Sequence, residues 1–274
     1  MSSHRIARPI GIFDSGIGGL TVAAAIRRSM PGERLLYFGD TEHFPYGERS
    51  PDAIRHYAIR ITNFLLDQGC KAIVIACNTA SAHASGPVEL TAGDQVPVFN
   101  VIDPVATHIA ETWPTGTIGV IGTKGTIASR VYVKAVAKRN KQVKVRSLAT
   151  PLLAPMIEEG FYNNNISLAV IRSYLEHRNL AGMEALVLGC THYPLIRDEV
   201  EKVVGSRVSV LDPPTIVAAT IKQGLKDQGL LRRSRTPAGA DKFFLSDMTD
   251  SFKSSAKRFF RKPMQLRELR MWDH

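Results

Sequence analysis

Nine short apolar runs, separated by segments of helical character, constrain the fold of this chain most strongly. They occupy residues 8–13, 33–38, 71–76, 96–101, 117–122, 143–148, 184–189, 207–211 and 241–246. Alternation of this kind is typical of βαβ units, in which a helix carries the chain back to begin a parallel neighbouring strand. We therefore expect an α/β protein built on parallel sheets.

The length and composition fit such a fold. The chain has 274 residues, of which 44% are apolar, enough for one large domain or two domains of common size. It contains no uninterrupted apolar stretch of about 18 residues, the length typical of a membrane helix. Its first 30 residues lack the apolar region of a signal peptide. We expect a soluble cytoplasmic protein with no membrane partner.

The segment after the second apolar run carries the clearest helix signals. Ser50 is suited to the N-cap, Pro51 to the first helical position and Gly69 to the position beyond the end. Proline near the start and glycine after the end are the usual boundaries of a helix. The pattern predicts one helix between Ser50 and Gly69.

Two cysteines end matching apolar runs. Cys77 follows KAIVIA and continues as Cys-Asn-Thr, whereas Cys190 follows EALVLG and continues as Cys-Thr-His. Buried parallel strands that end in polar residues bring those residues to the carboxyl edge of a sheet, where α/β proteins bind ligands. Two such strands predict two thiols that face one ligand. The third cysteine, Cys70, follows Gly69 without a polar signature and is expected to be structural.

An internal repeat indicates how the two thiols meet. GIFDSGIGG at 11–19 and GVIGTKGTI at 119–127 share the order strand, polar turn, glycine and helix. Asp14 precedes Cys77 by 63 residues, and Thr123 precedes Cys190 by 67 residues. We expect two similar doubly wound parallel-sheet domains in a pseudo-two-fold arrangement, with the active site in the cleft between them.

The glycine-rich turn DSGIGG follows a strand and opens a helix, as a dinucleotide-binding loop does. The G-x-G-x-x-G pattern fails because position 21 is Thr21 rather than glycine. The backbone N–H groups of the turn still favour an anion, and Asp14 could hold an ammonium group.

The loop GDTEHFPYG at 39–47 is a second candidate for ligand contact. Pro45 and Gly47 interrupt regular structure there, and polar and aromatic side chains are concentrated in it. Asp40, His43 and Tyr46 have an alternative role of equal weight, in which they satisfy the loop's own backbone.

Three kinds of chemistry are open to the thiols. A zinc site is disfavoured, since zinc usually takes four ligands and the chain lacks Cys-x2-Cys pairs. His192 could activate Cys190 or Cys77 as the nucleophile of a hydrolase, which leaves the other thiol unexplained. Two thiols flanking one carbon atom fit racemisation, in which one removes a proton and the other returns one on the opposite face.

Racemisation by thiols requires a thiolate. Because both cysteine motifs lead from a strand toward a helix, we expect helix N-termini and nearby donors to lower the pKa of the thiols. Asn78, Thr79 and Thr191 are expected to donate to carboxylate oxygens, on which charge grows in the transition state. A pyridoxal-dependent racemase is the chemical alternative, with Lys124 as its candidate Schiff-base lysine.

Five motifs stand in order over residues 11–195: GIFDSGIGGL, YFGDTEHFPYG, ACNTASA, VIGT and LGCTHYPL. Together they make the chain resemble the cofactor-independent glutamate racemases, a family in which two α/β domains enclose glutamate. The resemblance implies a first domain of residues 1–100 plus 212–274 and a second of residues 101–211. It also implies interconversion of L- and D-glutamate without cofactor or metal, which supplies D-glutamate for peptidoglycan synthesis.

The resemblance assigns roles to individual residues. Cys77 is expected to take the α-proton from D-glutamate and Cys190 from L-glutamate, assisted by Asp14, His192 and Glu158. Glu159 satisfies the same local pattern as Glu158. Contacts to the substrate are expected from Asp14, Ser15, Tyr46, Gly47, Asn78, Thr79, Thr123, Thr191 and His192. The related aspartate racemases typically have an acidic residue in place of His192, which favours glutamate.

Positive charge is concentrated toward the end of the sequence. The net charge is +10, and residues 222–274 hold 13 Lys or Arg against 6 Asp or Glu. The basic runs RRSR (232–235) and KRFFRK (257–262) are interpreted either as solvated helix faces or as a contact for nucleic acid or acidic lipid. Some relatives in the resembled family restrain DNA gyrase, which is a further candidate partner. A homodimer is also expected.

Overall fold

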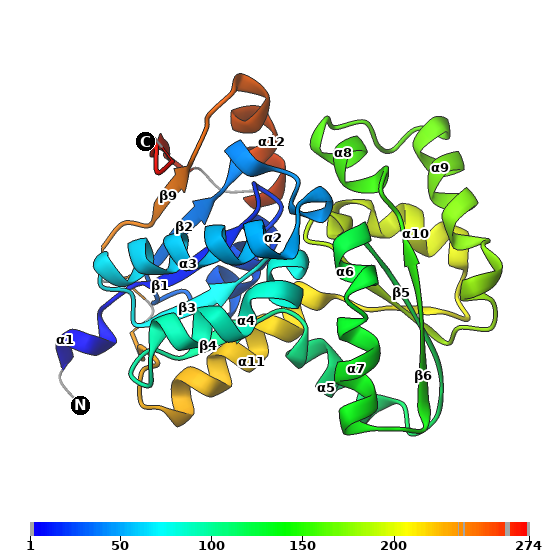
Figure 1. Ribbon diagram of the computed structural model, residues 1–274, viewed down its shortest axis with the longest axis horizontal. Helices are drawn as coiled ribbons and strands as arrows, with labels where there is room; N and C mark the ends of the chain where they lie inside the picture. The colour runs from blue at the N-terminus through cyan, green and yellow to red at the C-terminus, as the bar shows by residue number, and fades with distance from the viewer. Residues whose placement is uncertain (1–2, 235, 238, 261–263, 273–274) are drawn as a thin grey trace.

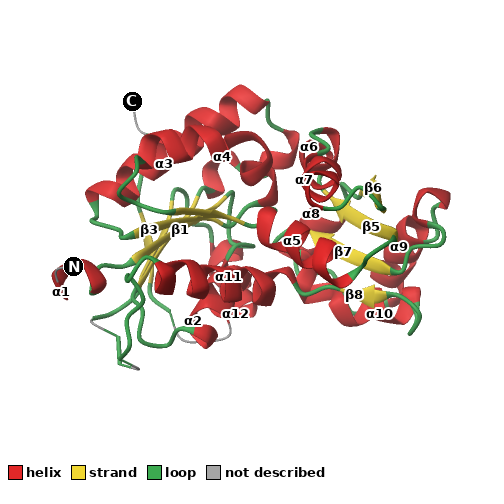
Figure 2. Ribbon diagram, turned by 90° about the horizontal axis from the view of Figure 1, so that it is seen from below, coloured by secondary structure: helices red, strands yellow, loops and turns green. Residues whose placement is uncertain are grey.

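The computed structural model describes residues 3–234, 236–237, 239–260 and 264–272, which form two lobes (Figure 1). Each lobe contains a parallel sheet with helices on both faces, which confirms the expected α/β fold with two parallel-sheet domains (Figure 2). The first lobe combines the early part of the chain, blue and cyan in Figure 1, with its last part, orange and red. The intervening green segment forms the second lobe.

The first sheet has six strands in the order β10-β9-β2-β1-β3-β4, and every pairing is parallel. The strands are β1 (Ile10–Asp14), β2 (Leu35–Gly39), β3 (Ala72–Ile75), β4 (Val98–Asn100), β9 (Lys242–Leu245) and β10 (Leu266–Glu268). The central strands β1, β2 and β3 are buried throughout, as expected for strands with helices on both sides.

The second sheet repeats part of this order. Its parallel strands run β6-β5-β7-β8, with bounds β5 (Gly116–Gly122), β6 (Val143–Ala149), β7 (Ala185–Gly189) and β8 (Ser209–Val210). This order matches β2-β1-β3-β4 of the first sheet, so that β6 corresponds to β2, β5 to β1, β7 to β3 and β8 to β4. Cys77 and Cys190 therefore follow equivalent strands, each beside the central strand of its sheet. A reversal of strand order beside that strand is where doubly wound sheets bind ligands.

All nine predicted strands are confirmed. The tenth strand, β10, was not predicted, because its sequence Leu-Arg-Glu has no apolar run and its residues are exposed or only partly buried. It pairs with β9 at the edge of the first sheet, where solvent replaces one neighbour.

Helices cover both faces of each sheet. Figure 2 shows α3 and α4 on one face of the first sheet and α2 and α11 on the other. The α-helices are α1 (Ser3–Ile6), α2 (Leu20–Ser29), α3 (Pro51–Asp67), α4 (Asn78–Ala92), α5 (Asp103–Thr112), α6 (Lys124–Ala128), α7 (Val131–Arg139), α8 (Leu153–Glu158), α9 (Asn165–Leu175), α10 (Arg197–Val204), α11 (Pro213–Asp227) and α12 (Asp250–Phe260). No helix within the described ranges is long and apolar enough to cross a membrane.

Four short 3-10 helices complete the described elements. They are η1 (Thr41–His43), η2 (Tyr46–Glu48), η3 (Arg178–Leu180) and η4 (Tyr193–Ile196). The first lies within the segment 39–47 that the sequence predicts as a loop, and the second begins in it and ends at Glu48. A single turn of this kind is compatible with Pro45 and Gly47, which prevent a longer helix.

The predicted helix between Ser50 and Gly69 is confirmed as α3. The Ser50 hydroxyl accepts a hydrogen bond from the Ala53 N–H at 3.2 Å, and Pro51 occupies the first turn. Gly69 has a φ of +74°, a conformation that side-chain-bearing residues rarely adopt. The buried face of α3 includes Ile54, Ala58, Ile61 and Leu65, at the three- and four-residue spacing of an amphipathic helix.

Replacing Ser50 with alanine should lower the free energy of unfolding by about 1 kcal/mol, because the Ala53 N–H loses its acceptor. Urea denaturation followed by circular dichroism measures the change. Ser50→Asp is the control, since aspartate caps helices equally well and should keep the wild-type midpoint. Equal midpoints for the wild type and Ser50→Ala would contradict the role of this cap.

Candidate active site

Cys77 and Cys190 line the same small cavity between the two lobes. Ten of the twelve residues predicted for the site line it: Ser15, Tyr46, Gly47, Cys77, Asn78, Thr79, Thr123, Cys190, Thr191 and His192. The other lining residues are Phe44 and Pro45, which belong to the loop 39–47 predicted to contact the ligand, and Ala154, which the sequence did not single out. The cavity meets the carboxyl ends of both sheets, as the repeated cysteine motifs predict.

The cavity is nearly closed. Its volume is about 20 Å³, which is enough for about one water molecule. Cys77 is 5% exposed and Cys190 is 7% exposed. An amino acid can therefore enter only when the two lobes or the loops around the cavity move apart.

Cys77 is the N-cap of α4. Its sulfur accepts a hydrogen bond from the Ala80 N–H at 3.4 Å, and its thiol donates to the Ser15 hydroxyl at 3.7 Å. Burial and the nearby charge of Asp14 raise the pKa of Cys77 to about 12, and the two hydrogen bonds only partly oppose this rise. The expectation of a lowered pKa was wrong for Cys77, because loss of hydration outweighs the helix N-terminus.

Asp14 lies behind the cavity rather than on its surface. Its carboxylate accepts hydrogen bonds from the N–H groups of Gly16 at 3.2 Å and Gly19 at 3.0 Å, which close the turn after β1. The Thr191 hydroxyl, from the other lobe, donates to the second carboxylate oxygen at 3.4 Å. Burial raises the pKa of Asp14. In this structure Asp14 thus shapes the turn and contacts the second lobe.

Cys190 belongs to a chain of buried polar groups. Its sulfur lies 3.7 Å from Nδ1 of His192, and Nε2 of the same ring makes a short contact with the Glu158 carboxylate. Burial disfavours the charged imidazole, but the charge of Glu158 and the contacts with Cys190 outweigh it and raise the pKa of His192 well above its ordinary value. Glu158 is 4% exposed, whereas Glu159 is exposed. Glu158 is therefore the carboxylate that reaches the site.

The surroundings of the second thiol differ from those of the first. Cys190 is followed by the 3-10 helix η4 and then by α10, so it does not cap an α-helix as Cys77 does. His192 stands beside it instead. The two thiols thus have different neighbours, a helix N-terminus at Cys77 and an imidazole ring at Cys190.

Hydrogen bonds across the cavity connect the two lobes. Thr79 in the first lobe contacts the hydroxyls of Thr123 at 2.9 Å and Thr126 at 3.2 Å in the second. The Tyr132 hydroxyl donates to the Asn78 side chain at 2.7 Å. Thr126 and Tyr132 were missed in the sequence because they lie on helices, far along the chain from their partners.

Two glycines allow the lobes to approach this closely. A Cβ atom at Gly18 would lie 2.5 Å from the His192 ring and from the Thr191 hydroxyl, and one at Gly47 would lie 2.6 Å from Cβ of Thr123. Contacts below 3.0 Å force a neighbouring atom to move. Both glycines therefore belong to the interface between the lobes.

In the loop 39–47, the side chains of Asp40, His43 and Tyr46 bond to other side chains and not, among the described residues, to the loop's own backbone. Asp40 is fully buried and accepts hydrogen bonds from Tyr46 at 2.6 Å and from Ser246 at 3.0 Å. It also accepts one from the Trp272 indole N–H at 2.8 Å and contacts the His43 ring at 3.0 Å. Asp40 and His43 thus support the loop, whereas Tyr46 and Gly47 line the cavity.

The basic helix α12 packs against the site instead of lying free in solvent. Ser255 donates to the Glu158 carbonyl at 2.8 Å and Arg258 donates to it at 3.2 Å. The Phe259 ring meets the His192 ring edge-on at 5.3 Å. The interpretation of residues 257–262 as a solvated face is therefore wrong for the buried Phe259 and Phe260. Arg235, Arg261 and Lys262 of the two basic runs lie outside the described residues.

The structure bears on two alternative chemistries, a pyridoxal-dependent racemase and a metal site. Lys124 does not line the cavity; its side chain is 58% exposed and pairs with Glu48 at 3.3 Å. Among the described residues, no group of three or more His, Cys, Asp or Glu is arranged to hold a metal ion.

The third cysteine lies away from the cavity. Cys70 is buried just before β3, at the end of the strand opposite to Cys77.

Replacing Glu158 with glutamine should lower the pKa of His192, because the charge that favours the imidazolium is removed while burial remains. Nuclear magnetic resonance of labelled histidine over a pH series measures this pKa, and the spectrum of His192→Gln assigns the signal. Glu159→Gln removes an exposed charge next in sequence and should leave the pKa unchanged. The same pKa in the wild type and Glu158→Gln would refute the pairing.

Known proteins similar to this chain share most of its length. Residues 20–221 match the family described as Asp/Glu/Hydantoin racemase. The chain is 40% identical to the glutamate racemase of Geobacter metallireducens over 252 residues, 92% of each protein. It is 41% identical to that of Chlorobaculum parvum over 261 residues, 94% of this chain and 95% of the relative.

Solved structures agree with these relatives. The glutamate racemase of Francisella tularensis in complex with D-glutamate superposes with a TM-score of 0.90 at 36% identity, covering 97% of this chain and 99% of that one. The glutamate racemase of Thermus thermophilus in complex with β-chloro-D-alanine gives a TM-score of 0.85 at 37% identity, covering 96% and 97%. With a match that spans most of both lobes, this chain belongs to the Asp/Glu/Hydantoin racemase family.

Proposed function

We propose that this enzyme interconverts L- and D-glutamate by proton transfer between the α-carbon and two thiols. The observation that carries the proposal is the convergence of Cys77 and Cys190, from equivalent strands of two similar lobes, on one cavity. A single nucleophile needs only one of them. Inversion at a carbon atom needs a base on one face and an acid on the other, which gives both thiols a task.

The relatives support glutamate as the substrate. The relatives at 40% and 41% identity are named glutamate racemases, and one superposed structure contains D-glutamate. The structures of an aspartate racemase and of an aspartate racemase homologue align at only 19% and 20% identity, which supports a shared fold alone. His192, in place of an acidic residue, is consistent with this choice.

The different surroundings of the thiols suggest their starting states. Two-base racemisation begins with one thiolate and one thiol. The pKa of Cys77 is raised to about 12, which favours its thiol form, and Nδ1 of His192 lies 3.7 Å from the sulfur of Cys190. We assign the thiol to Cys77 and the thiolate to Cys190 as the starting states. Cys190 then takes the α-proton of L-glutamate and Cys77 delivers its proton to the opposite face. The product is D-glutamate, with Cys77 left as thiolate and Cys190 as thiol, so the reverse reaction begins at Cys77.

Polar groups around the cavity complete the proposed mechanism. Hydroxyl and amide groups of Ser15, Asn78 and Thr79 can donate to the carboxylates and stabilise charge that develops on them. The Thr191 hydroxyl can do so when it turns from Asp14 to the substrate, because it has one proton to donate. We assign substrate contacts to Tyr46, Gly47 and Thr123 as well. The ammonium group of the substrate would bring a positive charge to this buried site and favour the Cys77 thiolate. Asp14 and Glu158 act behind the thiols, whereas His192 lines the cavity beside Cys190.

The wider role follows from the product. We propose that D-glutamate made here supplies peptidoglycan synthesis in the cytoplasm, and that the domains comprise residues 1–100 plus 212–274 and 101–211. The homodimer and the contact of the basic C-terminal region with nucleic acid or gyrase stay predictions. Because Phe259 and Phe260 are buried and Arg258 bonds to Glu158, the exposed Lys253 and Lys257 are the cations of α12 available for such a contact.

Circular dichroism of L-glutamate and, separately, L-aspartate in heavy water tests the proposal, with no pyridoxal phosphate added. We expect loss of ellipticity and α-deuterium, detected by mass spectrometry, with glutamate alone. Cys77→Ser and Cys190→Ser should each lower the rate of racemisation by at least about a hundredfold, the range of a lost acid-base group.

Cys70→Ala is the matched control, because it removes the third thiol at the far edge of the sheet and should keep near-wild-type turnover. Near-wild-type racemisation by both serine variants would rule out the two-thiol mechanism. Exchange with aspartate as fast as with glutamate would instead overturn the proposed substrate.

A further inference from the structure

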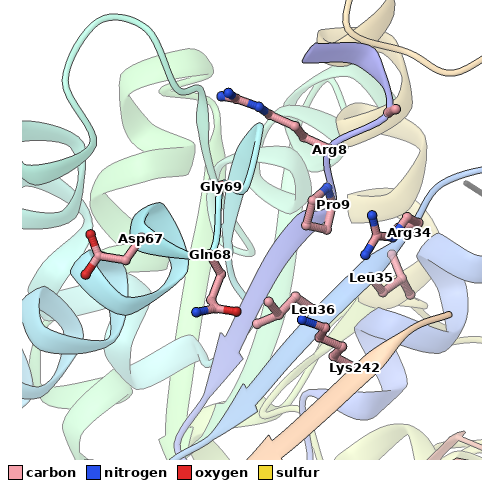
Figure 3. Close-up of a pocket in the computed structure, with 10 residues that line it drawn as sticks. Arg8, Pro9, Arg34, Leu35, Leu36, Asp67, Gln68, Gly69 and Lys242 are labelled. Atoms are coloured by element: carbon pink, nitrogen blue, oxygen red, sulfur yellow. The ribbon is translucent and has the colours of Figure 1, made fainter. Parts of the chain in front are cut away.

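A second cavity lies at the amino-terminal edge of the first sheet, away from the thiols. Figure 3 shows its lining, which comes from the starts of the adjacent strands β1, β2 and β9 and from the turn after α3. The volume is about 340 Å³. Asp14 ends β1 at the opposite edge, and a strand of five residues separates the two edges by about 15 Å. The cavity is therefore distinct from the candidate active site.

The charges that line this cavity are unbalanced. Arg8, Arg34 and Lys242 contribute three positive charges, and Asp67 is the one acidic residue among the lining residues. None of the three cations forms an ion pair with another described residue. Arg8 is exposed and extends away from the other two in Figure 3, so Arg34 and Lys242 are the cations left to attract an anion to this concave surface.

The acids nearest in sequence are already used. Glu33 precedes Arg34 but pairs with Lys71 and accepts from the Arg232 N–H at 2.8 Å. Asp241 precedes Lys242 but pairs with Arg27 and accepts from the Leu35 N–H at 2.9 Å. Glu33 and Asp241 are thus paired with Lys71 and Arg27, which do not line the cavity. Arg34 and Lys242 remain available for a ligand.

Arg34 has no ion-pair partner among the described residues, although it lines the cavity. Its Nε atom is buried under protein atoms and is not open to the cavity, so a ligand would meet the terminal nitrogens of the side chain. Figure 3 shows Arg34 and Lys242 reaching from the strand starts, with Gln68 on the opposite side.

The walls indicate what else the ligand carries. Pro9, Leu35 and Leu36 form an apolar surface beside the cations, and Gln68 adds an amide donor and acceptor. The volume is at the lower end of the range for small-molecule sites, and it exceeds the size of an inorganic ion. One arginine can donate two parallel hydrogen bonds to two oxygens of a phosphate, and a lysine adds a compact positive charge.

We propose that this cavity binds a small organic phosphate, with the phosphate on Arg34 and Lys242 and the organic part against Pro9 and Leu36. The proposal does not depend on the reaction at the thiols. Titration calorimetry of the full chain at low ionic strength tests it with ribose 5-phosphate and uridine 5′-monophosphate as probes. Ribose, uridine and inorganic phosphate are the comparison ligands. We expect saturable binding of at least one ester, and binding at least tenfold weaker for inorganic phosphate and for the uncharged compounds.

Variants locate the binding. Arg34→Gln combined with Lys242→Gln should weaken the ester at least tenfold, whereas Lys134→Gln combined with Lys222→Gln removes the same charge elsewhere and should have no effect. Gln68→Glu adds a carboxylate to the cavity from an exposed position and should also weaken binding. Circular dichroism verifies that each variant is folded.

Three results would overturn the proposal. No saturable binding of either ester up to about 10 mM would remove the site, since weaker binding falls below about 3 kcal/mol. Equal losses in the two charge-matched double variants would reduce the effect to the net charge of the protein. Binding of inorganic phosphate as tight as that of the esters would exclude a contribution from the apolar wall.

Discussion

Close contact between the carboxyl edges of two parallel sheets is the constraint on which the site depends. Strand ends and helix starts present polar groups there, and burial of these groups requires partners from the facing lobe. Thr79 with Thr123, and Tyr132 with Asn78, provide such partners. The glycine at position 18 leaves room for the His192 ring from the other side. The same contact that satisfies the interface also holds two thiols around one cavity.

Burial at this interface determines the electrostatics of the site. Loss of hydration raises the pKa of both Asp14 and Cys77, so charge is costly in the first lobe unless another charge compensates it. In the second lobe, Glu158 stabilises a charged His192. The lobes are therefore alike in topology but different in charge. This asymmetry is the physical basis for assigning opposite starting protonation states to Cys77 and Cys190.

Much of the fold was predictable because buried parallel strands are continuous apolar runs, and the repeated cysteine motifs place both thiols at strand ends. The edge strand β10 lacks such a run. Tyr132 carries no local signal, since its partner Asn78 lies on another lobe. In α12, the surrounding basic residues obscured the significance of Phe259. The pKa of Cys77 was mispredicted because sequence reveals a helix start but not how completely the opposite lobe covers it.

The nearly filled cavity has a kinetic consequence. Since it holds about one water molecule, every catalytic cycle includes opening for entry, closure for chemistry and opening again for release. An opening that separates the lobes breaks the hydrogen bonds between them, such as Thr79 with Thr123, whereas closure excludes solvent from the site. When opening is slower than proton transfer, a substrate deuterated at the α-carbon turns over at nearly the rate of the ordinary one. Solvent viscosity, rather than bond breaking, then governs the steady-state rate.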